Sequence, residues 1–240
     1  MTELKLSPRD LGPLRLPEFC EKCFWITLRC NKKLPFQMGF PGIFMSLDSY
    51  GKNLIRAHLE KHGHLPPWFP NIGEVKECVP SRELHWSRFQ FLDEDTQILI
   101  RGTPDDIFKL SDGSYHIVDY KTAKVTETQD TLFPLYEVQL NAYAMICEVR
   151  SLSPVVGLSL IYTEPLTQVN PDDAAALHSE ESFALRFKAT LKPVKIRPKE
   201  LIMPLLKRTR QIYDQAEPPA SREHCENCEL LQNLISVAAL

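Results

Sequence analysis

The sequence predicts an α/β fold in which helices flank a central mixed β-sheet, and three segments carry this prediction. Residues 105–110 and 115–121 are strand-like stretches separated by the turn signal Asp112-Gly113, which predicts a hairpin. Residues 136–151 have the apolar periodicity of a strong helix. Residues 155–165 form a nearly continuous apolar run, which is typical of a strand covered on both faces. Together they indicate a sheet with helices packed on it.

The N-terminal part of the chain predicts an irregular segment followed by a helix. Residues 16–42 are rich in Pro and Gly and contain three cysteines, so we expect irregular backbone that needs an external staple. Residues 46–63 have apolar side chains at roughly helical spacing. Ser46 or Asp48 is available as the N-cap of this helix, and Gly63 as its terminator.

The remaining elements follow from the same local signals. Alternating apolar and polar side chains predict three further strands, at residues 82–93, 96–102 and, at an edge, 183–192. Residues 197–216 read as a helix that Pro204 should kink. Residues 217–231 return to loop composition.

Length and composition predict one domain that stays in the cytoplasm. Residues 1–240 fit a single domain, with a core at 45–218 and cysteine-bearing terminal segments at 15–35 and 219–232. Hydrophobic residues make up 43% of the chain, yet no apolar run approaches the roughly 20 residues of a membrane span. The first residues lack the pattern of an export signal. A net charge of −3 argues against coating nucleic acid by bulk electrostatics, but not against a local basic groove.

Acidic and basic side chains are concentrated where the predicted sheet should be most buried. Asp119 and Lys121 lie two apart on one strand and therefore share a face, and the hairpin can bring Asp105 beside Asp119. Carboxylates that converge away from water repel unless a cation lies between them, and oxygen ligands suit Mg²⁺ or Mn²⁺. A turn-capping Asp and an edge-strand ion pair are the alternative. Gln139 and Tyr143, at i and i+4 of the next helix, favour a functional site.

Four cysteines near the two ends of the chain predict a second metal site. Cys20 and Cys23 form one Cys-x-x-Cys pair, and Cys225 and Cys228 form another. A metal bound by both pairs would hold the two terminal segments of the chain together. Four thiolates suit both tetrahedral Zn²⁺ and a [4Fe–4S] cluster, and their spacing alone does not decide between the two.

The sequence resembles the PD-(D/E)XK nucleases, specifically the RecB-like branch that includes the CRISPR-associated exonucleases. The resemblance rests on three stretches: "GTPDDIF" at 102–108, "IVDYKTAK" at 117–124 and "QLNAY" at 139–143. It implies a restriction-endonuclease-like core. It also implies that terminal cysteines hold [4Fe–4S], although the family often supplies one N-terminal and three C-terminal cysteines where this chain has two and two, so zinc stays an alternative.

The resemblance also implies roles for individual residues. Asp105 and Asp119 would be metal ligands, the Tyr120 backbone carbonyl would add a third contact, and Lys121 would be the catalytic lysine. Gln139 and Tyr143 would help to position the DNA strand. The expected activity is Mg²⁺- or Mn²⁺-dependent hydrolysis of DNA phosphodiester bonds, on single strands or at DNA ends.

One departure from the family keeps other functions open. Related nucleases usually carry a His or Glu metal ligand on the first helix, and here only His58 and Glu60 are candidates. If neither reaches the metal, we expect weakened or lost activity, and a noncatalytic nucleic-acid-binding module that retains the nuclease fold is the second alternative. A zinc-stapled structural protein is the third alternative.

Overall fold

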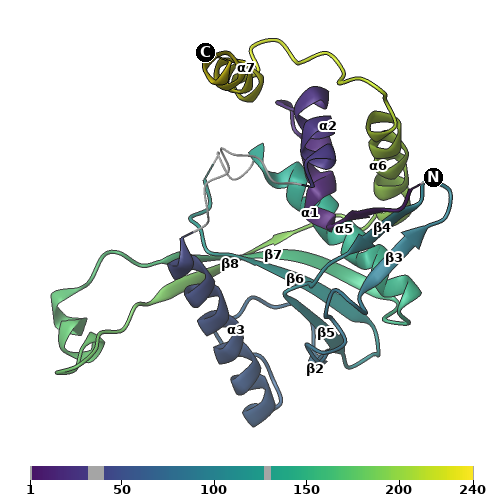
Figure 1. Cartoon of the computed structure of the whole chain (residues 1–240). Coiled ribbons are helices and arrows are strands. Elements are labelled where there is room, and N and C mark those ends of the chain that lie inside the picture. The colour runs from purple at the N-terminus through teal and green to yellow at the C-terminus, as the bar shows by residue number, and fades with distance from the viewer. Residues whose placement is uncertain (1, 32–40, 127–130, 240) are drawn as a thin grey trace.

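Helices cover both faces of a five-stranded mixed sheet, which confirms the predicted fold class (Figure 1). The computed structural model describes residues 2–31, 41–126 and 131–239. The strands of the sheet, in spatial order, are β2 (Val75–Cys78), β5 (Asp106–Leu110), β6 (Tyr115–Lys121), β7 (Val155–Pro165) and β8 (Phe187–Pro193). The pair β6 and β7 is parallel, whereas the other three pairs are antiparallel.

The predicted hairpin forms the middle of this sheet. Strands β5 and β6 pair in the register Asp106 with Val118 and Lys109 with Tyr115. Gly113 in the connecting turn has a φ of +85°, a conformation that glycine adopts without steric cost. The hairpin therefore returns the chain so that the start of β5 lies beside the end of β6.

Helix α5 (Phe133–Val149) connects the parallel strands β6 and β7 and covers one face of the sheet. Successive strand residues point to opposite faces. Ile117 and Leu160 accordingly pack in the core cluster of α5, whereas Val118 and Ile161 pack in a second cluster on the other face. Because β7 is buried on both faces over Leu158–Tyr162, its continuous apolar run is explained.

Helix α3 (Gly42–His62) covers the other face and begins earlier than predicted. Ile55 and Leu59 anchor it to the sheet, and Gly63 ends it in the left-handed conformation, as expected. The predicted N-cap at Ser46 or Asp48 is wrong, because Pro41 is the N-cap. The side chain of Asp48 is therefore free of a capping role.

A smaller sheet and helix α6 complete the body of the protein. The smaller sheet contains β1 (Leu4–Leu6), β4 (Ile98–Arg101) and β3 (Gln90–Asp93). The prediction of a strand over 82–93 is wrong for residues 82–89, which form turns. Helix α6 (Pro198–Tyr213) contains Pro204, and its buried Arg210 donates to the Thr96 carbonyl oxygen at 2.7 Å.

Both terminal segments are more regular than predicted. Helix α2 (Glu21–Arg29) lies within the segment expected to be irregular, and helix α7 (Glu226–Ala238) begins in the expected loop. Residues 32–40 of the N-terminal segment lie outside the described residues. Short helices α1 (Pro8–Leu11), η1 (Gly12–Arg15) and η2 (Pro171–Leu177) complete the structure. Helices α2 and α7 lie side by side (Figure 1).

None of the helices in the described ranges is both long and apolar enough to cross a membrane. Strand β8 is an edge strand of the large sheet, as predicted, although it begins four residues later, at Phe187. Residues 166–186 between β7 and β8 extend away from the body, and we call them the β7–β8 arm (Figure 1).

Candidate active site

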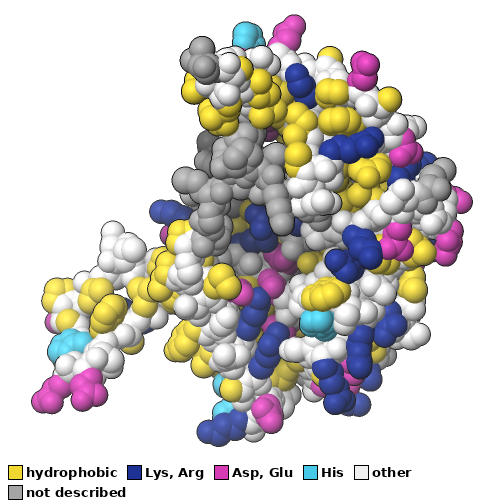
Figure 2. Space-filling model, in the orientation of Figure 1, with side chains coloured by type: hydrophobic (Ala, Val, Ile, Leu, Met, Phe, Trp, Pro, Cys, Tyr) yellow, Lys and Arg dark blue, Asp and Glu magenta, His cyan; other side chains and the backbone are white. Residues whose placement is uncertain are grey.

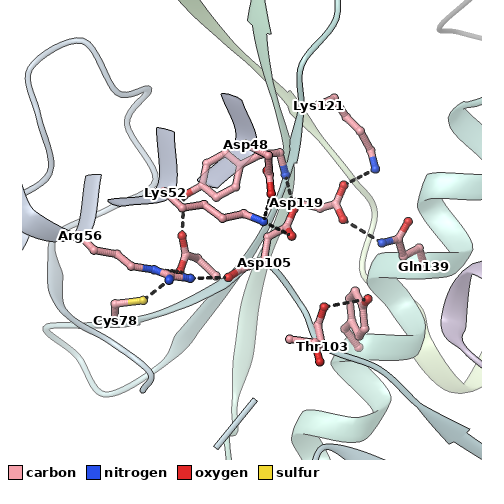
Figure 3. A network of polar contacts seen from close by, with 12 residues as sticks. Asp48, Lys52, Arg56, Cys78, Thr103, Asp105, Asp119, Lys121 and Gln139 are labelled. Carbon is pink, nitrogen blue, oxygen red and sulfur yellow. Dashed lines mark hydrogen bonds and ion pairs between the residues drawn. The ribbon is translucent and has the colours of Figure 1, made fainter. Parts of the chain in front are cut away.

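The two predicted carboxylates meet at one end of the central hairpin (Figure 3). Asp105 immediately precedes β5 and Asp119 lies near the end of β6, so the hairpin register brings them together. The Tyr120 backbone N–H donates to Asp105 Oδ2 at 2.8 Å, which fixes this carboxylate against β6. Asp105 and Asp119, which we call the acid pair, thus come from adjoining strand ends, as the sequence predicts.

Asp119 is almost enclosed and faces helix α5. Its side chain is held on both oxygens: Gln139 Nε2 donates to Oδ1 at 2.8 Å, and Lys121 Nζ lies 2.5 Å from Oδ2. Burial, followed by the negative charge of Asp105, raises the pKa of Asp119 to about 6. Lys121 opposes this rise because its ammonium group favours the carboxylate, so a charged Asp119 depends on nearby cations.

Helix α3 contributes three charged residues, Asp48, Lys52 and Arg56, that the sequence analysis did not place at the site. Lys52 Nζ lies 2.6 Å from both Asp105 Oδ1 and Asp48 Oδ2, so its ammonium group joins the two carboxylates. Burial of Lys52 disfavours its charge, but the negative charges of Asp105 and Asp48 outweigh burial and raise its pKa. Asp48, Lys52 and Arg56 recur every fourth residue, which places them on one face of the helix but does not by itself distinguish a site from a solvated face.

A buried hydrogen-bond network between α3 and the central hairpin supports the acid pair. Asp106 is fully buried, and Arg56 Nη2 pairs with its Oδ1 at 2.7 Å. The Tyr120 hydroxyl donates to Asp106 Oδ2 at 2.9 Å, and the Cys78 thiol donates to Oδ1 at 3.2 Å. Arg56 Nη2 also donates to the Asp105 carbonyl oxygen at 2.9 Å. These contacts tie α3 to the backbone that carries Asp105.

Tyr143 supports the segment before Asp105 and is itself buried. Its hydroxyl donates to the Thr103 carbonyl oxygen at 3.4 Å, and its ring lies against Gly102. A Cβ atom at Gly102 would lie 3.0 Å from both Tyr143 Cε1 and Pro8 Cδ, so glycine permits this close approach. Burial raises the pKa of Tyr143. Gln139 and Tyr143 therefore contact the acid pair and its supporting loop.

The structure does not bring His58 or Glu60 to the carboxylates. These residues lie six and eight positions beyond Lys52, about 9 and 12 Å further along α3. The His58 ring instead packs against His62 and His64, at centroid distances of 4.4 and 5.2 Å. Asp48 is the carboxylate that α3 contributes to the site.

The four terminal cysteines gather as predicted. Each Cys-x-x-Cys pair spans the first turn of a helix, because Cys20 is the N-cap of α2 and Cys225 is the N-cap of α7. Four sulfur atoms, those of Cys20, Cys23, Cys225 and Cys228, all lie within 4.8 Å of one another. This cluster can bind a metal, and it joins residues 202 to 208 positions apart in the chain.

Hydrogen bonds and burial have opposite effects on the pKa of Cys20. Although burial acts in the opposite direction, the backbone N–H groups of Cys23 and Arg222 lower the pKa of Cys20 to about 6. Burial raises the pKa of Cys228 to about 11. Three cysteines lie outside the cluster: Cys30 is exposed, Cys78 is half-buried and Cys147 is buried in the core.

Comparison with known proteins identifies the family. A model of the PD-(D/E)XK nuclease superfamily matches residues 54–232, and the chain belongs to that superfamily. A search of curated proteins gives no match. One solved structure, titled "Crystal structure of SSO0001", is similar at a TM-score of 0.40 and 14% identity, covering 91% of this chain and 80% of that one. A similarity this low adds no argument about function.

Proposed function

We propose that the chain is a Mg²⁺- or Mn²⁺-dependent nuclease that hydrolyses DNA phosphodiester bonds on single strands or at DNA ends. The observation that carries the proposal is the convergence of Asp105 and Asp119 beside the ammonium groups of Lys52 and Lys121. Carboxylates in a nearly buried place require cations, and phosphodiester hydrolysis requires positive charge near the phosphate. Membership of a nuclease superfamily supports the same function.

The donor atoms at this site fit a hard divalent cation. Asp105 and Asp119 would hold the ion together with the Tyr120 backbone carbonyl, and Asp48 adds a carboxylate from α3 next to Asp105. All of these donors are oxygen atoms, which Mg²⁺ and Mn²⁺ prefer. A bound ion would supply Lewis acidity toward the phosphate and lower the pKa of a coordinated water.

The neighbouring side chains have complementary roles in this proposal. Lys121 stays partly open to solvent, so its ammonium group can orient the attacking water and offset charge that develops on the phosphate. Gln139 keeps Asp119 in place through the amide hydrogen bond at 2.8 Å. Tyr143 keeps the loop before Asp105 in place.

A cleavage assay with three DNA forms tests the proposal. End-labelled single strands, blunt linear duplex and closed circular duplex are incubated with Mg²⁺, Mn²⁺ or EDTA. Wild type should digest the single strands or the linear ends only when a metal ion is present. Asp119→Asn and Lys121→Met should each lose at least about 100-fold in rate. Lys124→Met is the matched control, because Lys124 is exposed and pairs with Glu164 instead. Cleavage in EDTA, or full activity of Asp119→Asn, would refute the proposal.

A noncatalytic nucleic-acid-binding module is the second candidate, and Lys52 is the observation that favours it. Its ammonium group already joins Asp48 and Asp105, so it can take the place of a metal ion at these two carboxylates. Retention of DNA without turnover in either metal ion would establish this alternative. Measurable cleavage that Asp119→Asn abolishes would exclude it.

We further propose that the cysteine cluster holds one Zn²⁺ ion rather than [4Fe–4S]. Four thiolates around one zinc at about 2.3 Å form a tetrahedron whose corners are about 3.8 Å apart. The sulfur separations are 3.7 Å between Cys20 and Cys228, 3.5 Å between Cys23 and Cys225, and 3.3 Å between Cys23 and Cys228. In a [4Fe–4S] cluster the four cysteines bind four different irons and must lie farther apart.

Metal analysis of the purified protein separates these alternatives. Protein prepared anaerobically should contain about one zinc per chain and lack absorption in the visible range. Four irons per chain with a brown visible band would show that the iron–sulfur expectation is correct and the zinc proposal wrong. A Cys225→Ser variant should lose the bound metal in either case.

A further inference from the structure

A cavity of about 300 Å³ lies on the α3 side of the sheet. It is next to the site formed by Asp48, Asp105 and Asp119, which we call the acidic site. It is bounded by one flank of α3, by Trp68, by the ends of β6, β7 and β8, and by the base of the β7–β8 arm. Its lining is mainly apolar and includes Leu47, Tyr50, Leu54, Trp68, Leu166 and Phe187. The volume is at the lower end of the range in which proteins bind small molecules.

Two large aromatic side chains at this cavity remain exposed. Tyr50 is 63% exposed and Trp68 is 45% exposed, although each ring would gain free energy from being covered. Figure 2 shows hydrophobic side chains over the N-terminal half of α3 and at the base of the β7–β8 arm. Apolar groups gathered around a hollow indicate a binding surface more strongly than apolar groups scattered singly.

Two residues that line the cavity are chain neighbours of the charged groups in the acidic site. Gly51 lines the cavity and precedes Lys52, which pairs with Asp105. Thr122 lines the cavity and follows Lys121, which pairs with Asp119. Neighbouring Cα atoms are about 3.8 Å apart, so two walls of the cavity are one residue away from the charged groups. Lys121 itself faces α5, over the ring of Tyr136, so the cavity adjoins the acidic site through Lys52 and Asp105 on the α3 side.

We propose that this cavity binds an unpaired nucleobase of the DNA strand whose phosphate lies at Asp105 and Asp119. A nucleobase has flat apolar faces that stack on Trp and Tyr rings, and polar edges that can bond to hydroxyl groups. Tyr50 and Trp68 supply the rings. Thr122 and Thr163 supply hydroxyl groups at the lining. Arg186, also at the lining, pairs with the exposed Asp173 at 3.4 Å and would exchange this partner for the adjoining backbone phosphate.

This inference rests on the proposed nuclease function and makes it more specific. A base inside a duplex is paired and stacked, and extruding it costs free energy. A site that accepts one base next to the reacting phosphate therefore favours single strands or frayed ends. The cavity gives a structural reason for the strand preference, which the acidic site alone does not provide.

The test uses a variant that fills the cavity without disturbing the fold. A Cβ atom at Gly51 would have no neighbour within 4 Å, so Gly51→Leu adds a side chain in open space at the cavity wall. Leucine also favours a helix interior more than glycine does, so the variant should melt no lower than its parent. Trp68→Ala removes the stacking ring instead. Trp86→Ala is the matched control, since Trp86 is 47% exposed and does not line this cavity.

Binding is measured in EDTA with the full chain carrying Asp119→Asn, the variant expected to cleave at least about 100-fold more slowly. Fluorescence anisotropy with a labelled 12-nucleotide thymidine strand should give a Kd about tenfold weaker for Gly51→Leu and for Trp68→Ala. Trp86→Ala should bind like the parent. An abasic nucleotide is then placed at each position in turn. One position should weaken binding to the parent about tenfold and leave binding to Gly51→Leu unchanged.

The outcomes separate this inference from the nuclease proposal. Parental affinity of both Gly51→Leu and Trp68→Ala for every strand would overturn the nucleobase site and favour a protein segment as the occupant of the cavity. If wild type cleaves DNA under that result, the nuclease proposal stands alone. If wild type fails to cleave while the cavity variants and the abasic position weaken binding, the nucleobase site stands and the hydrolytic function is refuted.

Discussion

Replacing Lys52 with methionine removes the ammonium group that joins Asp48 and Asp105, while it keeps most of the apolar stem. Lys52 Nζ lies 2.6 Å from each carboxylate, and its side chain is only 16% exposed. Hydrogen bonds to charged groups contribute about 1.5–3 kcal/mol each, and here part of this is lost to side-chain entropy and burial. We therefore expect the metal-free variant to lose about 2 kcal/mol of unfolding free energy, or about 6 °C in Tm.

Divalent metal should reverse this effect, because the ion and the ammonium group compete for the same carboxylates. Without Lys52, the ion no longer has to displace a cation, so Mn²⁺ should bind about tenfold more tightly to Lys52→Met than to wild type. Mn²⁺ at about 100 times its Kd should add about 2.7 kcal/mol to the stability of the variant. Titration calorimetry gives the affinity, and thermal melts with and without Mn²⁺ give the stability.

The control for this experiment is Lys61→Met, at an exposed position near the end of the same helix. It should change neither the metal-free Tm nor the Mn²⁺ affinity. The reasoning would be refuted if Lys52→Met melted like wild type without metal and bound Mn²⁺ no more tightly. Such a result would mean that Lys52 does not hold the carboxylates in solution.

Three further predictions follow from other parts of the structure. Arg56→Met leaves the charge of Asp106 buried without its main partner, so Tm should fall by about 9 °C, for about 3 kcal/mol; a fall below 2 °C would contradict this. Cys228→Ser should lose the bound metal in elemental analysis, whereas Cys30→Ser, outside the cluster, should keep it; equal metal contents would count against the site. Burial lowers the pKa of His116 to about 4, while an unfolded histidine titrates near 6.5. Between these values only the unfolded state takes up the proton, so stability should fall as pH drops from about 6.5 to about 4. In urea melts, His116→Asn should make stability less dependent on pH in this range. An unchanged pH dependence would show that His116 does not cause the fall.

The central hairpin, α5 and β7 could be predicted because their signals are local. The turn at Gly113 and the alternation of residues 115–121 fix the strands without reference to the rest of the chain. Once the hairpin is drawn, Asp105 and Asp119 must meet. The acid pair is thus a consequence of strand register, which the sequence contains.

The structure of the terminal segments was harder to predict, because the Cys-x-x-Cys spacing fits both a loop and a helical turn. Two cysteines three positions apart suit an irregular metal loop, yet they also lie on one face of a helical turn. The Pro and Gly residues of segment 16–42 all lie outside residues 18–34, so the average composition obscured helix α2. Residues 82–89 show the opposite error: alternation suggested a strand, although His85 and Ser87 bond to each other within turns.

Lys52 and Asp48 could not be assigned from local signals, because their role depends on where α3 packs. The spacing of Asp48, Lys52 and Arg56 predicts an ordinary solvated helix face. Ile55 and Leu59 place that helix on the sheet, and only then does the charged face meet Asp105 and Asp106. The same packing carries His58 and Glu60 away from the carboxylates.

The alternation of strand β6 explains how one short strand can serve two sides of the site. Asp119 faces α5 and is held there by Gln139, whereas the next residue, Tyr120, faces α3 and bonds to buried Asp106. The backbone N–H of Tyr120 holds Asp105 between these two sides. Because each carboxylate is fixed by a different helix, a small shift of either helix changes the separation of the acid pair. Metal affinity should therefore respond to packing on both faces of the sheet before the fold itself is lost.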